Sequence, residues 1–438
     1  MYLLMAIIFI LGYIAIALEH NIHIDKSAPA LLIGVLCWTL LVVGADSILV
    51  EQVAGHGDIS HYINHQLSEH LSEISSILFF LLGAMTIVEL IDSYGGFSII
   101  TDKIKTTHKV KLIWILSILT FFLSAALDNL TTSIVMAALL RKLIDDKEDL
   151  WFFAGIIVIA ANAGGAWSPI GDVTTIMLWI GGQVSAQNIV VQLFLPSLVA
   201  LLVPLCIVSF MLKGNIMRPK VLAGEHHQVT VNDFEKQLIF FLGVGSLLFV
   251  PVFKTLTHLP PFMGILFGLG VLWLVTEVLN HKKTEAKEKL SIVNVLTKID
   301  VPSVLFFLGI LLAVAALQTA GHLTQLASLL ETTFGNIYII NIFIGLLSSI
   351  VDNVPLVAGA MGMYSLDVYP MDNMFWELLA YCAGTGGSAL IIGSAAGVAI
   401  MGILKIDFIW YMKKISWLAI IGYFSGVLTF YLQAQLFH

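Results

Sequence analysis

The chain has 438 residues, of which 58% are hydrophobic and 11% are charged, and its formal net charge is −8. A soluble domain has roughly 25% charged residues. The composition therefore excludes a soluble globular protein and indicates a helical bundle in contact with membrane lipid, with no nucleic-acid partner.

Apolar segments recur from end to end of the chain. We treat residues 2–18 as a first membrane helix and not a signal peptide, because no Lys or Arg precedes the run and no small-residue cleavage pattern follows it. The predicted segments, two of them interrupted, are 2–18, 28–50, 74–92, 111–127, 130–140, 151–182 (interrupted), 189–212, 236–253, 262–279, 301–320, 336–351, 354–366, 376–404 (interrupted) and 415–433.

Two of these segments are too short to cross a bilayer, since a spanning helix needs about 20 residues. Residues 130–140 and 354–366 each follow an Asp-Asn pair, Asp128-Asn129 or Asp352-Asn353. We expect two re-entrant hairpins and about ten transmembrane helices. All of the 21 Lys and Arg residues except Lys254 then face the cytoplasm, in agreement with the positive-inside rule, and both termini lie outside.

The two halves of the sequence repeat the same landmarks in the same order. Asp128-Asn129 matches Asp352-Asn353, 224 positions later, and Gly164-Gly165 matches Gly386-Gly387, 222 positions later. Each half holds five crossings and one hairpin, so the second copy enters the membrane from the opposite side, as in transporters built from inverted repeats. The predicted fold is an all-α polytopic membrane protein. One repeat comprises residues 1–222, with helices 1–5 and a broken helix at 161–172. The other comprises residues 223–438, with helices 6–10 and a broken helix at 384–388.

Polar residues gather at the four predicted breaks. Irregular backbone at membrane depth is tolerated where it lines a protein-covered or water-filled site, and a buried charge there costs about 2.5–3.5 kcal/mol on insertion scales. An acid that binds either a proton or Na⁺ offsets much of this cost, and oxygen ligands suit an alkali cation. The predicted ion-binding residues are Asp128, Asn129, Thr132, Asn162, Asp172, Thr174, Thr175, Ser348, Ser349, Asp352, Asn353, Ser388 and Ser394.

Within this set we expect Na⁺ at Asp128, Asp172 and Asn162, with no resident cofactor. Glu89 and Asp92, near the predicted cytoplasmic end of the third helix, are candidates for a proton path or an interfacial helix end. His56, His61, His65 and His70 are spaced four to five residues apart. This spacing suits a metal or pH-sensing site, but we favour a solvated face of an interfacial helix.

The break sequences together resemble the NhaD-type sodium/proton antiporters of the ion transporter superfamily, over roughly residues 70–410. The strings that carry the resemblance are residues 124–132, 161–175, 348–355 and 384–388. The resemblance implies export of Na⁺ and Li⁺ in exchange for external H⁺, a homodimer with a scaffold part and a moving part, and a location in the bacterial inner membrane. The residues that match the family's important polar positions are Asp128, Asn129, Asn162, Asp172, Thr174, Thr175, Ser348 and Asn353.

Several alternatives stay open. A sodium-coupled carboxylate symporter shares the resembled fold, but its hairpin tips resemble Ser-Asn-Thr, whereas acids at this chain's tips repel an anionic substrate. An arsenite or citrate exporter is a weaker candidate on the same grounds. An intramembrane protease is disfavoured, because Pro169-Ile170-Gly171-Asp172 departs from Gly-x-Gly-Asp and no His-Glu-x-x-His is present. A passive channel fits paired titratable breaks less well than alternating access does.

Overall fold

The computed structural model describes residues 1–17, 19, 24–49, 59–101, 103–219, 231–280, 290–350, 352–391 and 393–437. Within these ranges the chain is helical, without a strand, which confirms the predicted all-α membrane fold. The helices of the first half are α1 (Tyr2–Ala17), α3 (Ser27–Val43), α4 (Ala45–Ile48), α5 (Ile59–Ser93), α6 (Ser98–Thr101), α7 (Lys109–Leu127), α8 (Asn129–Leu143), α9 (Lys147–Ala166), α10 (Val173–Ile180) and α11 (Ala186–Met211). Those of the second half are α12 (Asp233–Thr257), α13 (Pro261–Asn280), α15 (Ile292–Leu296), α16 (Val301–Thr319), α17 (His322–Phe334), α18 (Ile337–Leu347), α19 (Asn353–Met363), α20 (Met374–Gly386), α21 (Ala395–Leu404), α22 (Phe408–Lys414) and α23 (Ser416–Phe437).

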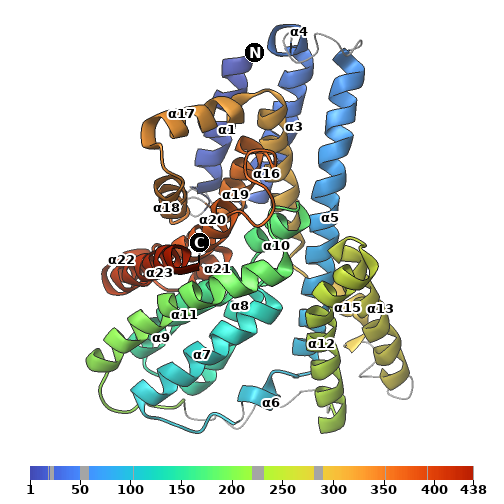
Figure 1. The fold of residues 1–438 in the computed structure, drawn as a ribbon. Helices are drawn as coiled ribbons and strands as arrows, with labels where there is room; N and C mark the ends of the chain where they lie inside the picture. Colours follow the sequence, from blue (N-terminus) through green and yellow to red (C-terminus); the bar gives the residue numbers. More distant parts are fainter. Residues whose placement is uncertain are drawn as a thin grey trace.

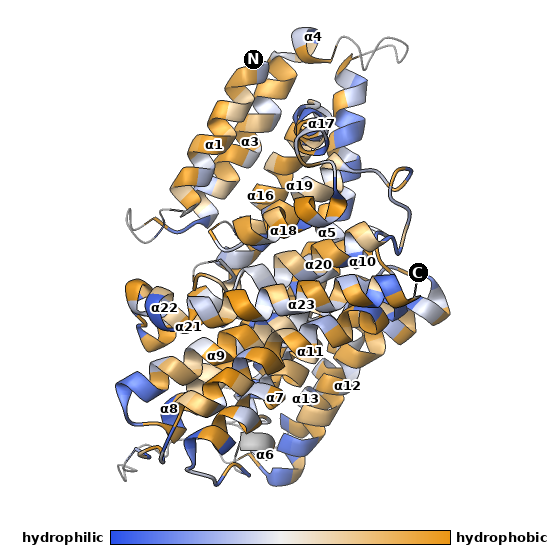
Figure 2. Cartoon of the chain, turned by 60° about the vertical axis from the view of Figure 1, so that its left-hand side comes forward, coloured by the Kyte–Doolittle hydropathy of each residue, from blue (hydrophilic) through white to orange (hydrophobic). Residues whose placement is uncertain are grey.

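Apolar side chains cover the outside of the bundle as well as its core. Phe210 is 86% exposed and Val278 is 76% exposed. Figure 2 shows hydrophobic residues along most helix surfaces, with hydrophilic residues gathered near helix ends and connections. Outward-facing apolar surface of this extent suits lipid contact, and helices suit lipid because they satisfy their own backbone groups.

The described part of the chain contains eight helices that are long and apolar enough to cross a membrane. The number rises to ten if α17 with α18 and α21 with α22, each bent by 117°, count as one span apiece. The total agrees with the predicted number, but the members differ. The helices α1 and α3 fall in a shorter class, whereas α7, predicted as a hairpin arm, is among the eight.

Neither α17 nor α22 belongs to the apolar segments predicted from the sequence. The sequence of α17 alternates apolar residues with Thr, Gln and Glu, and α22 is seven residues long and ends in two lysines. The helix α5 begins at Ile59 and is therefore longer than the predicted 74–92 segment. His61 and His65 are exposed on this extension, whereas His70 is largely buried, with its Nε2 3.3 Å from Thr319 Oγ1, so the favoured solvated face holds for only these two of the four histidines. His56 lies outside the described residues. The basic residues Lys220, Lys282, Lys283, Lys287 and Lys289 also lie outside them.

Helices from both sequence halves pack against one another in two groups. In the first group α3 packs on α16, and α12 and α13 pack beside α5. Figure 1 shows α5 running through the height of the view, with α12 and α13 beside its lower part and α1 and α3 near the top. In the second group α7 packs on α9, α8 on α21, α11 on α23 and α18 on α20. We call these the α5 group and the α9 group. The division at residue 222 stays a prediction.

Candidate functional site

Four helix breaks meet inside the α9 group. Two are the tips between α7 and α8 and between α18 and α19, and two are the interruptions that separate α9 from α10 and α20 from α21. Both long segments are interrupted, but at other residues than predicted: the first break covers 167–172 rather than 161–172, because α9 continues to Ala166, and the second covers 387–394 rather than 384–388, because α20 continues to Gly386. Each break joins the C-terminus of one helix to the N-terminus of the next, so both signs of helix-end charge are available there.

Asp172 lies at the centre of these breaks and is 1% exposed. It is the N-cap of α10, where its Oδ1 accepts a hydrogen bond from the Thr174 N–H at 3.0 Å. Its own N–H donates to Thr175 Oγ1 at 3.2 Å, which completes a capping box. The carboxylate is therefore fixed by the start of α10 and points away from water.

The hairpin tips contribute one asparagine each to Asp172. Asn129 Nδ2, from the first tip, donates to Asp172 Oδ2 at 2.6 Å. Asn353 Nδ2, from the second tip, lies 3.4 Å from Oδ1 and 3.3 Å from Oδ2 of the same carboxylate. Both asparagines are 3% exposed. Residues more than 180 positions apart thus converge on one acid.

Asn162 extends the network to the fourth break. It lies within α9 and is fully buried, and its Oδ1 accepts from Asn129 Nδ2 at 3.1 Å. Its Nδ2 lies 2.9 Å from Ser388 Oγ and 2.9 Å from Ser394 Oγ. We call Asn129, Asn162, Asp172, Asn353, Ser388 and Ser394 the Asp172 network. It brings together six of the predicted residues, at least one from each break.

Asp128 lies next to the network and has an unusual backbone. Its Oδ1 accepts from Thr131 N at 2.7 Å and its Oδ2 from Thr131 Oγ1 at 2.8 Å, so it caps α8. Its φ of 83° and ψ of 161° fall in a region that is essentially reserved for glycine. Strain of this kind costs about 1–3 kcal/mol and concentrates at functional sites.

The two halves make matching contacts around the site. Ser124 Oγ donates to the Ala161 carbonyl oxygen at 2.6 Å, and Ser348 Oγ donates to the Ala383 carbonyl oxygen at 2.9 Å. A Cβ on Gly164 would collide with the Phe121 backbone, and a Cβ on Gly386 would collide with the Gly345 backbone. Ser394, the N-cap of α21, stands at the position that Asp172 holds in the first half.

The remaining predicted residues have other surroundings. Within the described part of the chain the hydroxyl of Thr132 is buried without a hydrogen bond, so its oxygen is free to accept a ligand. Ser349 Oγ donates to the Leu346 carbonyl oxygen at 2.7 Å. Glu89 forms an ion pair with Lys298, with Glu89 Oε1 3.5 Å from Lys298 Nζ. Glu89 and Asp92 both lie on α5 and not at the breaks. The ion-binding and proton-path roles of all these residues stay predictions.

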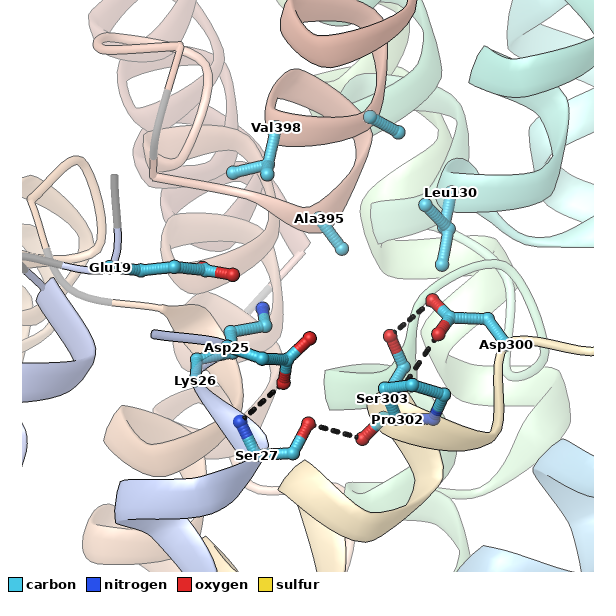
Figure 3. Close-up of a pocket in the computed structure, with 11 residues that line it drawn as sticks. Glu19, Asp25, Lys26, Ser27, Leu130, Asp300, Pro302, Ser303, Ala395 and Val398 are labelled. Atoms are coloured by element: carbon cyan, nitrogen blue, oxygen red, sulfur yellow. Dashed lines mark hydrogen bonds between the residues drawn. The ribbon is translucent and has the colours of Figure 1, made fainter. Parts of the chain in front are cut away.

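A polar pocket of about 180 Å³ adjoins the site and was not anticipated from the sequence. Figure 3 shows Glu19, Asp25 and Lys26 across the pocket from Asp300, with Leu130 above Asp300 and Ala395 between the two sides. Leu130 follows Asn129 in the sequence, and Ala395 follows Ser394, so the pocket lies between the α5 group and the Asp172 network. We call it the acidic vestibule. Its lining residues come from segments far apart in the sequence, so no local sequence pattern predicts this pocket.

The donor set decides which ions suit this site. Carboxylate, amide and hydroxyl oxygens suit a hard cation such as Na⁺. The described residues contain no group of three or more His, Cys, Asp or Glu side chains arranged to hold a metal ion. The oxygen donors around Asp172 are of the kind that suits a hard cation and not a soft metal.

Comparisons with known proteins agree with the resemblance drawn from the breaks. A family model described as citrate transporter matches residues 13–379. The chain is 47% identical to sodium/proton antiporter 1 of Arabidopsis thaliana over 429 residues, which cover 97% of this chain and 71% of that protein. It is 32% identical to the Na⁺/H⁺ antiporter NhaD of Alkalimonas amylolytica over 459 residues, which cover 98% and 90%. The chain belongs to the NhaD-type sodium/proton antiporter family.

The extent of the matches matters for the site. The family model ends before the break between α20 and α21, but the matches to the NhaD-type relatives cover nearly all of the chain. A second Arabidopsis thaliana relative, sodium/proton antiporter 2, is 44% identical over 438 residues and is covered to 98% of its length. The matches to the NhaD-type relatives therefore extend over the residues of all four breaks, and the chain is a multi-pass membrane transporter rather than an enzyme.

Proposed function

We propose that this chain exchanges cytoplasmic Na⁺ for external H⁺ and that Asp172 is the group for which the two ions compete. The observation that carries the proposal is the hydrogen-bonded network that joins one buried carboxylate to polar side chains from all four breaks. Such a carboxylate is costly to keep charged and alone. Either a proton or a bound Na⁺ removes that cost, so occupancy by one ion opposes occupancy by the other.

The asparagines supply the means of exchanging partners. In the hydrogen-bonded state the Nδ2 groups of Asn129 and Asn353 face Asp172. Rotation of each amide turns its Oδ1 toward the carboxylate and creates oxygen ligands for Na⁺ without moving a helix. Asn162, Asp128 and the Thr132 hydroxyl stand beside them as further oxygen donors. We propose Asp128, Asn162 and Asp172 as the core of the Na⁺ site, with Li⁺ also accepted.

The acidic vestibule supports the proposed direction. Its wall carries three acids, Glu19, Asp25 and Asp300, and one base, Lys26, whose charge is paired with Asp352. The positive-inside rule predicts that Lys26 and the nearby Lys298 face the cytoplasm. A cleft lined by negative charge raises the local concentration of cations. Cytoplasmic Na⁺ then enters through the vestibule and H⁺ is loaded from the other side.

Alternating access completes the proposed cycle. The matched contacts of Ser124 and Ser348 and the matched close approaches of Gly164 and Gly386 support two related repeats. We propose that the repeats are inverted, that the α9 group moves against the α5 group, and that the chain works as a homodimer in the bacterial inner membrane. No cofactor is required, because the proton gradient drives the exchange.

The second candidate is a sodium-coupled carboxylate symporter, which the description of the matching family model favours. The site argues against it, since an anionic substrate would meet Asp128 and Asp172 at the breaks, neither of which is paired with a basic side chain among the ion pairs of the described residues. The oxygen donors around Asp172 favour ion exchange over an arsenite exporter, a protease or a passive channel.

The experiment is proton flux in proteoliposomes with an acidic lumen, after external NaCl, LiCl, KCl or choline chloride is added. Citrate and succinate are tested in parallel with NaCl. Proton release on addition of Na⁺ or Li⁺, without carboxylate uptake, is the expected result. Na⁺-dependent uptake of a carboxylate without cation-induced proton release would overturn the proposal in favour of the symporter.

A further inference from the structure

One ion pair crosses from the α5 group to the second hairpin tip. Lys26 Nζ lies 3.2 Å from Asp352 Oδ2, and the two side chains are 19% and 13% exposed. Lys26 immediately precedes α3, and its Nζ also lies 4.3 Å from the centroid of the Phe306 ring on α16. The ammonium is therefore held by an aromatic face on one side and by a carboxylate on the other.

Asp352 connects this pair to the Asp172 network. Its Oδ1 accepts from Val354 N at 3.2 Å and caps α19. The next residue, Asn353, contacts Asp172. A change in the position of the Asp352 carboxylate therefore shifts the adjacent Asn353, whose side-chain amide contacts Asp172.

The charges at the breaks give the pair its significance. Asp128, Asp172 and Asp352 all lie at helix breaks, and among the ion pairs of the described residues Lys26 is the one basic side chain that pairs with any of them. A covalently attached ammonium cannot be transported. The charge of Asp352 is therefore balanced by the Lys26 ammonium, whereas Asp128 and Asp172 have no such partner among the ion pairs of the described residues.

We propose that Lys26 is a tethered, non-transported cation that occupies Asp352, so that Asp352 positions Asn353 and does not bind the transported ion. Lys26 is thereby a positioning residue for transport. This inference rests on the proposed exchange of Na⁺ for H⁺. It gives Asp352 a different role from the ion ligand that the sequence predicts, and leaves two break carboxylates, Asp128 and Asp172, for Na⁺ and H⁺.

The proposal predicts charge effects of opposite sign. Lys26→Gln leaves an unpaired carboxylate beside the site, which holds Na⁺ and slows its release. The Na⁺ concentration for half-maximal flux falls about three-fold or more, and the maximal rate also falls. Asp352→Asn leaves an unpaired ammonium, which repels Na⁺, and the half-maximal concentration rises by about three-fold or more. Asn is itself a good N-cap, so this change removes the charge while keeping the cap.

The experiment compares wild type, Lys26→Arg, Lys26→Gln, Asp352→Asn and the Lys26→Gln/Asp352→Asn double variant in proteoliposomes. The two readouts are Na⁺-dependent proton flux and binding of radioactive Na⁺ to the purified protein. Lys109→Gln is the matched control, because Lys109 pairs with Asp149 at 2.6 Å and the two side chains are 20% and 18% exposed. It removes a comparably buried pair at the start of α7, away from the breaks.

We expect the two single changes to shift the half-maximal Na⁺ concentration in opposite directions and the double variant to lie close to wild type. Lys26→Arg, which keeps the charge, is expected to resemble wild type. Shifts in the same direction for both single variants, or a Lys26→Gln that behaves like Lys109→Gln, would overturn the proposal. If Lys26→Gln does not fold, Asp352→Asn and Lys26→Arg still decide it, since an unshifted Asp352→Asn also overturns it. Absence of Na⁺-dependent flux from both wild type and Lys109→Gln would instead refute the proposed exchange.

Discussion

Asn129 Nδ2 donates to Asp172 Oδ2 at 2.6 Å and thereby joins the tip between α7 and α8 to the break between α9 and α10. Hydrogen bonds to a charged group stabilise by about 1.5–3 kcal/mol. In the proposed cycle this bond occupies the carboxylate while no cation is bound, and it is exchanged for an amide-oxygen contact when Na⁺ arrives. The strength of the bond therefore sets part of the affinity for Na⁺.

Replacement of Asn129 by Ala tests this exchange. The change removes both the donor and the prospective oxygen ligand, so the half-maximal Na⁺ concentration should rise about ten-fold. Asn280→Ala is the matched control, because Asn280, the last residue of α13, is 4% exposed and donates to Oη of Tyr94, which directly follows α5, at 2.8 Å. Flux measurements that shift equally for both variants would show that loss of a buried amide, rather than of this amide, is responsible.

The backbone of Asp128 predicts a separation of stability from transport. Its φ and ψ suit glycine, so Asp128→Gly should be more stable than Asp128→Ala by about 1–3 kcal/mol. Both variants lose the carboxylate and should lose most Na⁺-dependent flux. Thermal unfolding of the purified variants, followed by fluorescence, measures the first effect. Equal melting temperatures for the two variants would mean that Asp128 is not strained.

Ser348 distinguishes a structural hydroxyl from an ion ligand. Its Oγ already donates to the Ala383 carbonyl oxygen, as Ser124 Oγ donates to that of Ala161. Ser348→Ala should therefore lower stability by about 1 kcal/mol, with little change in the half-maximal Na⁺ concentration. A large rise in that concentration at unchanged stability would restore Ser348 as a ligand, in line with the sequence-based prediction.

The vestibule predicts a dependence on ionic strength. Hydrogen bonds from Ser27 lower the pKa of Asp25, so Asp25 keeps its charge even below the pH at which an ordinary aspartate loses it. Asp25→Asn should raise the half-maximal Na⁺ concentration about two-fold at low ionic strength, and equally at pH 6.5 and pH 8.5. In high choline chloride the difference should vanish, because salt screens the attraction. A difference that persists in high salt would point to direct ligation by Asp25 instead.

The sequence predicts the breaks well because their signals are local. Pro169 and the glycines around it break the helix between α9 and α10 whatever the rest of the chain packs against. The aspartate of each Asp-Asn pair caps the helix that follows it. Asp172 is found as a polar residue in one of these breaks, whereas Asn162 lies one turn before the break, within α9. Their hydrogen-bond partners are set by packing between the two halves, which no local pattern reports.

The Lys26–Asp352 pair and the helix α17 could not be predicted from the sequence. The pair joins residues 326 positions apart, and one lysine beside an apolar segment gives no sign of its partner. The polar residues along α17 interrupt the apolar run that a membrane helix is expected to show. Both features are determined by tertiary contacts, in which α17 packs on α19 and Lys26 packs on α16.

Flux through Asp172→Asn shows whether Na⁺ and H⁺ compete for this carboxylate, because Asn keeps the shape and the N-cap of α10 while removing the exchangeable charge. The measurement is Na⁺-induced proton release from proteoliposomes that contain equal amounts of wild-type and variant protein, each checked for a monodisperse, thermally stable state. We expect release from wild type and none from Asp172→Asn. Full Na⁺-dependent proton release from a well-folded Asp172→Asn would contradict it and would move the competition between Na⁺ and H⁺ away from this carboxylate.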